Sequence, residues 1–393
     1  MVSLFQDRTM LALNLAVFLI MLGVGMIVPL LPQKLITLEG PEAPVGYVAS
    51  FFALSFILLQ VPVGNLSDRL GFKIFLAAGY LLCALAGLLF YLAHSAGLIF
   101  LGRLVQGAGE APLWALAPAL LSIKYPLERG RVMGIYNAVF HLGLTAGPLL
   151  GVALAGVWNG NQAFLFYAAV CLAGALVILL GVDDVRTGKL AARQDLRFSS
   201  ILALAARRDT LAALLGITLY GTGYGIFLTV LPAHLITVKG FSATNVGVFF
   251  ALFYSAISFS QLSGPLSDRF GRRMFMVAGL VTAAAGLGSF SALGQPLVSV
   301  VLALAGLGLG VFFLSSLAFL NEAVPDSLKG TISGAYYLFW GFGMFFGPVL
   351  VDRLGKLAGE STGFYIFSLA LLLEAALLAA VSGNKSIQAG IGR

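Results

Sequence analysis

Apolar segments of 20 or more residues follow one another along the whole of this 393-residue chain. A helix needs about 20 residues to cross the hydrocarbon core of a bilayer. The composition agrees, because 60% of the residues are hydrophobic and only 10% are charged, whereas average soluble domains carry about 25% charged residues. We therefore expect an integral membrane protein with twelve transmembrane helices, over 10–36, 45–66, 74–93, 97–122, 131–157, 162–182, 210–237, 243–266, 274–293, 296–321, 330–357 and 362–381.

Other classes of structure fit this pattern less well. Barrel strands are short and alternate polar with apolar residues, which these segments do not. The first segment is too long for the apolar core of a cleavable signal, and no small-residue cleavage site closes it. Cys83 and Cys171 lie inside apolar segments and are interpreted as two buried thiols rather than a disulfide. His94, His141 and His234 are scattered, so no metal site is predicted.

Lysine and arginine are distributed unequally between the two sides of the predicted membrane. Of the 23 such residues, 18 fall at the termini and in the even-numbered connections, and four fall on the opposite side. The positive-inside rule then places both termini in the cytoplasm of a multi-pass protein of the cell (inner) membrane. The net charge of +7 is thus a signal of topology. Nucleic-acid binding is not expected, because the basic residues are spread over separate short loops.

One charged segment occurs twice. GNLSDRLGFK at 64–73 is matched by GPLSDRFGRR at 264–273, 200 positions later. LPQKLITLEG at 31–40 and LPAHLITVKG at 231–240 share the same offset. A constant offset predicts two homologous six-helix halves, and because both begin on the same side, they are parallel repeats related by an axis along the membrane normal.

The repeat predicts a division of the chain into three parts. They are an N-terminal six-helix bundle over 1–182, a cytoplasmic linker over 183–209 and a C-terminal six-helix bundle over 210–393. The linker carries six Lys and Arg residues and few large apolar residues. The predicted fold class is an all-α membrane protein of 12 helices in two parallel six-helix repeats.

Twelve helices, a 6+6 repeat and the motif G-x-L-x-D-R-x-G-R/K between helices 2 and 3 resemble the major facilitator superfamily. The resemblance covers nearly the whole chain. It implies a transporter rather than an enzyme, with a small-molecule path between two halves that rock to open alternately to each side. It also implies a monomer that works in the lipid bilayer.

In that family the repeated loop acts as a gate on the cytoplasmic side. An aspartate there can accept from a helix N-terminus or pair with an arginine, and such a contact must break when that side opens. The alternative is a loop that fixes topology with solvated charges. Phe72 departs from the family pattern, which usually has a basic residue there, as Arg272 is in the second copy. The predicted gate residues are Gly64, Asp68, Arg69, Gly71, Lys73, Asp268 and Arg269.

The segment GLTAGPLLG at 143–151 resembles the helix 5 signature of the drug:proton antiporter branch, G-x-x-x-G-P-x-x-G. Its small residues also form a face for close helix packing, and its proline permits a bend. Packing and antiport are therefore both open readings of this element. Its residues are Gly143, Gly147, Pro148 and Gly151.

Two charged residues stand in the fourth apolar segment, within RLVQGAGEA at 103–111. Arg103 and Glu110 are seven apart and lie on one helix face. A buried carboxyl group can take up and release a proton, so Glu110 is a candidate proton carrier. A substrate contact and a structural pair with Arg103 stay open. Arg103 matches the family's helix 4 arginine, whereas the family usually has a small residue at Glu110. His141 is a third candidate for proton coupling, or a neutral packing residue.

Aromatic and amide side chains share faces of helices that line the central cavity in the family. Such faces suit a lipophilic or amphipathic substrate, including a cationic one. Packing is the alternative for each of them. The cavity candidates are Asn14, Trp114, Asn137, Tyr220, Tyr224, Phe227, Tyr254, Gln261, Tyr336 and Trp340.

The sequence thus favours a secondary active transporter that couples proton entry to efflux of a lipophilic or amphipathic small molecule. No cofactor is expected, because the proton gradient supplies the energy. The alternatives are a symporter or uniporter of a small polar solute such as a sugar, and a lipid flippase on the same fold. An enzyme is disfavoured, since no HExxH, P-loop or G-x-S-x-G motif is present.

Overall fold

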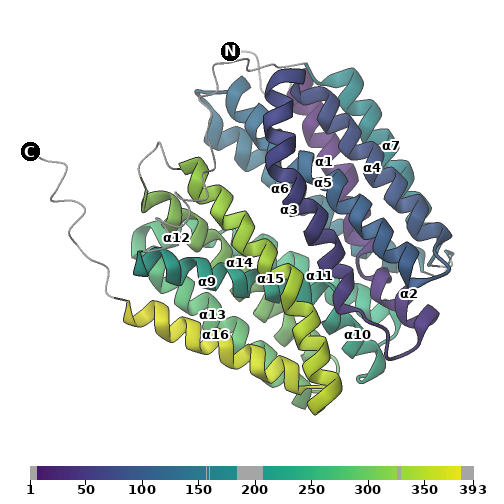
Figure 1. Cartoon of the computed structure of the whole chain (residues 1–393), viewed down its shortest axis with the longest axis vertical. Helices are drawn as coiled ribbons and strands as arrows, with labels where there is room; N and C mark the ends of the chain where they lie inside the picture. The colour runs from purple at the N-terminus through teal and green to yellow at the C-terminus, as the bar shows by residue number, and fades with distance from the viewer. Residues whose placement is uncertain (1–6, 156, 159, 184–206, 325–328, 382–393) are drawn as a thin grey trace, which may run out of the picture.

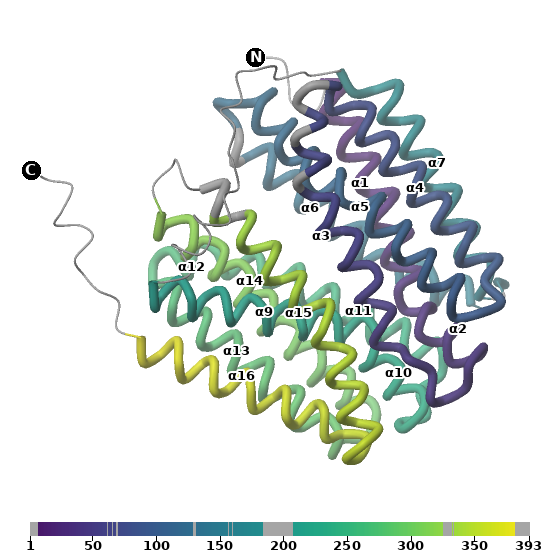
Figure 2. Tube along the Cα trace, in the orientation of Figure 1, coloured from purple at the N-terminus to yellow at the C-terminus, as the bar shows by residue number. Residues whose placement is uncertain are grey.

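The computed structural model describes residues 7–155, 157–158, 160–183, 207–324 and 329–381. Within these ranges the regular structure is helical and no strand occurs. Figures 1 and 2 show two groups of helices set at an angle, one from each part of the chain.

The first group holds the helices up to residue 181. They are α1 (Arg8–Ile27), α2 (Leu30–Glu39), α3 (Gly46–Leu70), α4 (Phe72–Leu92), α5 (Ala96–Lys124), α6 (Arg129–Leu154) and α7 (Gln162–Gly181). The second group holds α9 (Arg208–Leu228), α10 (Val230–Thr237), α11 (Ala243–Ser260), α12 (Ser263–Phe270), α13 (Arg272–Ser289), the 3-10 helix η3 (Phe290–Ala292), α14 (Leu297–Glu322), α15 (Lys329–Ala358) and α16 (Thr362–Ala380). We call these groups the first half and the second half.

Several predicted segments are broken into two helices. The first predicted segment becomes α1 and α2, which meet at Pro29. Its repeat becomes α9 and α10, which meet at Thr229. A proline in or beside each short helix removes a backbone donor and favours a bend. The duplication is therefore visible in the irregularities of the fold as well as in its helices.

In the described ranges, eleven spans are long and apolar enough to cross a membrane. Helix α5 has 29 residues but is not among them. Its polar residues Arg103, Gln106 and Glu110 lower its hydropathy. The protein is an integral membrane protein, and α5 is a long helix of the first half that carries polar residues within its length.

Each half uses the same neighbours. In the first half α1 packs on α6 and α7, α5 packs on α3 and α4, and α4 packs on α7. In the second half α9 packs on α15 and α16, α14 packs on α11 and α13, and α13 packs on α16. The halves meet where α3 contacts α15 and α6 contacts α11. The predicted fold of two six-helix repeats is confirmed, whereas the domain boundaries stay a prediction because residues 184–206 of the linker lie outside the described ranges.

The repeated charged segment is helical rather than a loop, which corrects the prediction. Helix α3 continues to Leu70, and residues 263–270 form α12. The chain turns only at Gly71 and Gly271, each with φ of 99°. L-residues rarely adopt this backbone conformation, and glycine adopts it without steric cost. The ten-residue motif is thus a helix end, a one-residue turn and a helix start.

We call the side on which α1 begins and α16 ends the terminus side. On the opposite side the beginning of α3 is bonded to the end of α15. Arg353 Nη2 donates to the Tyr47 hydroxyl at 2.9 Å, and Lys356 Nζ donates to the carbonyl oxygens of Glu42 at 2.9 Å and Ala43 at 3.1 Å. These bonds hold the halves together at the end away from the repeated motif.

Candidate functional site

A row of polar side chains runs along one face of α5. Arg103, Gln106, Glu110 and Trp114 are spaced by three, four and four residues, which places them on one side of a helix. The first three are buried, with exposed fractions of 2%, 0% and 4%. We call these four residues the α5 polar row.

The arginine of this row is held by groups from two helices. Its Nε donates to the carbonyl oxygen of Val48 in α3 at 2.8 Å, and its Nη1 donates to Gln106 Oε1 at 2.8 Å. Its Cζ lies 4.6 Å from the centre of the Phe52 ring. A buried cation needs such acceptors and a ring face, since burial alone disfavours a charge. Arg103 therefore connects α5 to α3, the helix that packs on the second half.

The carboxyl group of the row is bonded to two neutral donors. Gln106 Nε2 donates to Glu110 Oε1 at 3.0 Å, and Trp114 Nε1 donates to Glu110 Oε2 at 3.2 Å. Arg103 and Glu110 are thus joined through Gln106, and the structure gives them no direct hydrogen bond among the described residues. A carboxyl group without a directly bonded cation is free to change its charge without breaking an ion pair.

Aromatic rings lead from this row into the second half. Trp114 lies edge-on to Phe56 with ring centres 6.2 Å apart, and Phe56 lies 5.7 Å from Trp340 of α15. Trp340 lies 6.4 Å from Tyr224 of α9, and Tyr224 lies 6.1 Å from Tyr220. Four of the predicted cavity residues are therefore linked by ring contacts that cross between the halves.

Two further cavity candidates join this aromatic set through phenylalanines of the second half. Phe313 contacts both Tyr220 and Tyr336, with ring centres at 5.3 and 5.9 Å. Phe253 contacts Tyr254 at 5.3 Å and Tyr224 at 6.4 Å. Tyr254 and Tyr336 are both 1% exposed, so in this conformation they contribute to packing.

The remaining predicted cavity residues lie apart from these rings or inside the core. Phe227 is fully buried and stacks on Phe253. Asn14 donates to the Met10 carbonyl of its own helix, Asn137 is exposed on α6, and Gln261 caps α11.

His141 is half-buried on α6. Its ring is edge-on to that of its neighbour Phe140, which in turn contacts Trp114 at 5.2 Å. Its Nδ1 has no hydrogen-bond partner among the described residues. The structure thus places His141 near the α5 polar row without bonding it to Glu110, and its predicted part in proton coupling stays a prediction.

The glycines of the helix 5 motif bring α6 against α1. A Cβ added at Gly143 would lie 2.7 Å from the Phe18 carbonyl oxygen, and one at Gly147 would lie 2.4 Å from that of Leu22. Gly151 is less crowded, and Pro148 packs beside Gly25. These contacts explain the small residues by packing, and an antiport role is a further step that they do not test.

The predicted gate residues are placed at the terminus side, on both sides of the turns at Gly71 and Gly271. The side chains of Asp68 and Arg69 lie outside the described part, and Lys73 is half-buried at the start of α4. In the second copy Asp268 pairs with Arg272, and Arg269 lies over the Phe270 ring. A Cβ added at Gly64 would meet nothing within 4 Å.

Sequence reasoning missed two residues that complete these contacts. Gln106 bridges Arg103 and Glu110, and its spacing of three and four from them could have revealed it. Phe56 joins Trp114 to Trp340, and no local pattern distinguishes it from the 30 other phenylalanines.

Comparisons with known proteins agree with this architecture. The family model described as Major Facilitator Superfamily matches residues 13–348 and 251–386. The chain is 25% identical to the uncharacterized MFS-type transporter MJ1560 of Methanocaldococcus jannaschii, over 92% of this chain and 95% of the relative. It is 26% identical to the class C tetracycline resistance protein of Escherichia coli, over 84% and 86%. It is 22% identical to the quinolone resistance protein NorA of Staphylococcus aureus, over 63% and 66%.

Solved structures show the same fold. The nucleoside transporter NupG, in its D323A form, matches with a TM-score of 0.78 and 17% identity, over 95% of this chain and all of that one. A bacterial homologue of the lysosomal transporter Spinster, inward-facing and occupied, matches with a TM-score of 0.79 and 17% identity, over 96% and 97%. With the six-plus-six arrangement and the family match over most of the sequence, the chain belongs to the Major Facilitator Superfamily.

Proposed function

We propose that this transporter exports a lipophilic or amphipathic small molecule in exchange for protons, by alternating access. The observation that carries the proposal is the α5 polar row, in which a buried carboxyl group, Glu110, is bonded to Gln106 and Trp114 and is linked to Arg103 only through Gln106. The terminus side is the cytoplasmic side in this proposal, and the proton gradient is the energy source.

A proton on Glu110 changes what its neighbours can do. The ionised carboxylate accepts bonds from Gln106 and Trp114, whereas the protonated form has a donor in place of one acceptor. The new O–H then needs an acceptor of its own, and the bond accepted by the protonated oxygen is weakened. Gln106 also holds Arg103, and Arg103 holds the Val48 carbonyl of α3. The protonation state is thereby connected to the helix that packs on the second half.

Coupling requires that the proton bind the two states of the transporter with different affinity. In the present conformation Arg103, Gln106 and Glu110 are buried, and both oxygens of the Glu110 carboxyl group accept a hydrogen bond. Opening to the other side would change the water around Glu110 and the bond that Arg103 makes to α3. We infer that the proton favours one of these arrangements and the substrate the other.

The substrate class follows from the rings beside the row. Trp114 is 36% exposed, and Trp340 and Tyr224 are partly exposed, so aromatic faces come from both halves, with the buried Phe56 packed between Trp114 and Trp340. Such faces suit apolar and cationic groups. The relatives named for resistance to tetracycline and to quinolones support the same class for this chain.

Transport into proteoliposomes under an imposed pH gradient tests the proposal. The panel contains a lipophilic cationic dye, a sugar and a nucleoside. We expect the dye to be transported and Glu110→Gln to abolish its pH-driven transport while dye binding persists. Glu374→Gln is the matched control, because Glu374 is a carboxyl group of α16 that is only 6% exposed but lies outside the row. Unchanged pH-driven transport in Glu110→Gln would refute the proposed proton carrier, and pH-independent sugar or nucleoside uptake would replace the proposed function.

Gln106→Leu tests the connection between the charged residues. It keeps a side chain of similar size but removes both bonds that Gln106 makes. We expect pH-driven transport to fall at least tenfold and its pH profile to move, because the carboxyl group loses a donor. A slower rate with an unmoved pH profile would show that Gln106 has a packing role only.

A further inference from the structure

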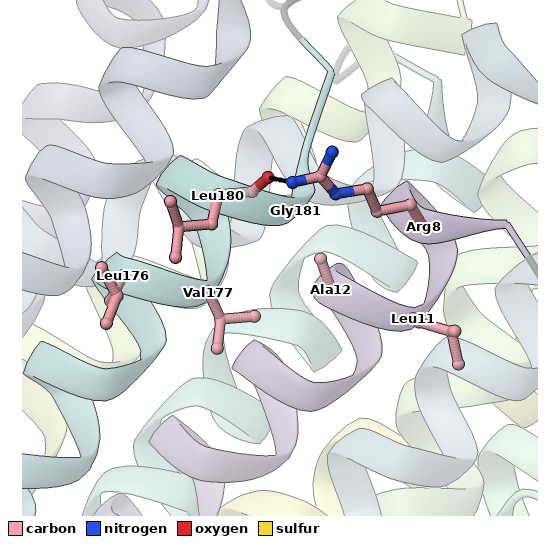
Figure 3. A pocket seen from close by; sticks show the side chains of 7 residues that line it. All are labelled: Arg8, Leu11, Ala12, Leu176, Val177, Leu180 and Gly181. Carbon is pink, nitrogen blue, oxygen red and sulfur yellow. Dashed lines mark hydrogen bonds between the residues drawn. The ribbon is translucent and has the colours of Figure 1, made fainter.

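Two cavities lie at the terminus side, one in each half, away from the α5 polar row. The first is a groove of about 410 Å³ between α1 and α7, lined by Arg8, Leu11, Ala12, Leu176, Leu180 and Gly181 among others (Figure 3). The second is a cavity of about 250 Å³ whose lining includes Arg207, Ala212, Arg273, Leu378 and Val381. We call them the α1–α7 groove and the α9–α16 cavity.

The two cavities share part of their lining in the repeat. The offset of 200 residues relates Ala12 to Ala212 and Gly181 to Val381, and both members of each pair line their cavity. Both cavities therefore lie beside the first and last helices of a half near the terminus side, and the α9–α16 cavity is lined by α13 and α14 as well. The lining of each cavity also includes arginine, Arg8 in the first and Arg207 and Arg273 in the second.

The walls of the α1–α7 groove are apolar and accessible. Leu11, Leu176 and Leu180 are 50%, 57% and 61% exposed. Helix α7 packs mainly on α1 and α4, which leaves its other face to the surroundings. Since α1 and α7 both belong to spans that are long and apolar enough to cross a membrane, we expect lipid chains around these leucines.

The arginine of this groove stands at the end of the membrane span. Figure 3 shows Arg8 above the apolar walls, with one Nη donating to the Leu180 carbonyl oxygen and the other directed away from it. The nearby acids have other partners. Asp183 accepts from Lys124 at 2.7 Å and from Thr9 at 2.9 Å, and Asp7 accepts from Lys124 at 3.3 Å. No ion pair involves Arg8 among the described residues.

The α9–α16 cavity likewise has basic groups with spare donors. Arg273 Nε donates to the Leu378 carbonyl oxygen, while its Nη2 is buried without a partner among the described residues. Arg207 Nη1 donates to the Ala323 carbonyl oxygen at 3.1 Å. An unpaired buried donor is costly, and an acceptor with negative charge satisfies it best.

Two acids line this cavity, and both already have partners. Glu322 accepts from Arg272 at 2.9 Å. Asp209 accepts from the Thr210 backbone N–H at 2.8 Å and lies 3.5 Å from Arg207. The donor left over is therefore the guanidinium of Arg273.

From these observations we propose that each half binds an anionic phospholipid of the terminus-side leaflet. Its phosphate contacts Arg8 in the α1–α7 groove and Arg273 in the α9–α16 cavity. In the groove an acyl chain lies along Leu11, Leu176 and Leu180. The proposal does not depend on the proposed transport function.

Native mass spectrometry of the full chain tests it, with phosphatidylglycerol compared with phosphatidylcholine. We expect the unaltered protein to retain two phosphatidylglycerol molecules in preference to phosphatidylcholine. Arg8→Gln and Arg273→Gln should each weaken one site about fivefold, which is the effect of one basic residue near an anionic membrane surface. Arg131→Gln is the control, because Arg131 is a basic residue of the same side whose side chain is 62% exposed and whose partner is Glu128.

Three results would overturn the proposal. The first is equal retention in Arg8→Gln, Arg273→Gln and Arg131→Gln. The second is equal binding of the two lipids by the unaltered protein, a measurement that needs no variant to fold. The third is a rise in melting temperature with inorganic phosphate alone that phosphatidylglycerol does not exceed, which would assign the arginines to a free anion.

Discussion

The two halves share a fold but differ in where their charged residues lie. In the first half α5 carries Arg103, Gln106 and Glu110 inside the membrane span, whereas the equivalent positions of α14 are Ala303, Gly306 and Gly310. Side chains of α11 occupy the space beside the two glycines of α14. A Cβ on Gly306 would lie 2.6 Å from the Phe253 ring, and one on Gly310 would lie 2.3 Å from Ser260 Oγ.

At the terminus side the difference is reversed. In the second half Arg272 bonds Glu322 at 2.9 Å and Ser267 at 2.6 Å. The equivalent positions in the first half are Phe72 and Ser122, and Phe72 is only 3% exposed. In the described residues the first half thus has a polar row along α5 and a buried phenylalanine at position 72, whereas the second half has glycines along α14 and an arginine–glutamate pair at the motif. Both halves keep the same helix packing, but the buried charged row of α5 has no counterpart at the equivalent positions of α14.

The largest effect is expected from removing the buried cation. Arg103→Leu leaves the Val48 carbonyl and Gln106 Oε1 without their donor. We expect a loss of about 3–5 kcal/mol in the free energy of unfolding, as for a broken buried charge network. Denaturant or thermal unfolding in detergent measures it, with Leu101→Ala on the exposed side of α5 as the control. A loss below about 1 kcal/mol would show that the row is not structurally coupled to α3.

The halves should respond alike where they pack alike. A Cβ at Gly147 would lie 2.4 Å from the Leu22 carbonyl oxygen, and one at the equivalent Gly347 would lie 2.3 Å from the Thr222 side chain. We expect Gly147→Ala and Gly347→Ala each to cost about 1–3 kcal/mol through overpacking. Gly134→Ala, which meets nothing within 4 Å, is the control. A loss of unfolding free energy in only one of the two variants would show that the two packing faces are not equivalent.

A smaller effect is expected from making the second half resemble the first at the motif. Glu322→Ser gives α14 the residue that α5 has at the same place. Since the Glu322 side chain is 59% exposed, we expect a loss of at most about 1 kcal/mol in unfolding free energy. The salt dependence of the melting temperature provides the second readout, because an exposed ion pair weakens as salt rises. A loss above about 2 kcal/mol would mean that the pair is essential to the fold.

The smallest effect is expected from Asp183, which follows α7 at the terminus side. Hydrogen bonds from Lys124 and Thr9 lower the pKa of Asp183 below its usual value. A carboxyl group with a lowered folded-state pKa stabilises the fold above the pKa of the unfolded state, and this contribution is lost as pH falls through the folded-state value. Asp183→Asn should cost at most about 1 kcal/mol near pH 7. Melting curves should show the difference from the unaltered chain beginning to shrink as pH falls below about 4, the ordinary aspartate pKa, and a difference that stays constant in stronger acid would contradict the assignment.

The sequence predicted the helices and the repeat well because both depend on local composition. Runs of apolar residues must be helical in lipid, since backbone groups there have to be bonded within the segment. The ends of the helices were harder to predict. The charged motif was expected to be a loop, but the backbone bond from Gly71 to Ser67 continues α3 up to the turn.

The candidate site was predicted only in part. Arg103 and Glu110 were found because charges in an apolar helix are costly and rare. Gln106 and Phe56 were missed, since an amide beside charges and one phenylalanine among 31 carry little signal by themselves. Phe227 was expected to face a cavity, and in this conformation it is stacked in the core of the second half.

The sequence by itself determined that this protein spans a membrane, that it is built from two six-helix copies and that α5 carries the buried charges. Each of these follows from which residues stand in which apolar segment. Only the tertiary structure decided that Glu110 reaches Arg103 through Gln106, and that aromatic rings connect this row to the second half. Contacts between side chains depend on how helices far apart in the sequence approach and rotate, and residue spacing within one helix does not specify that.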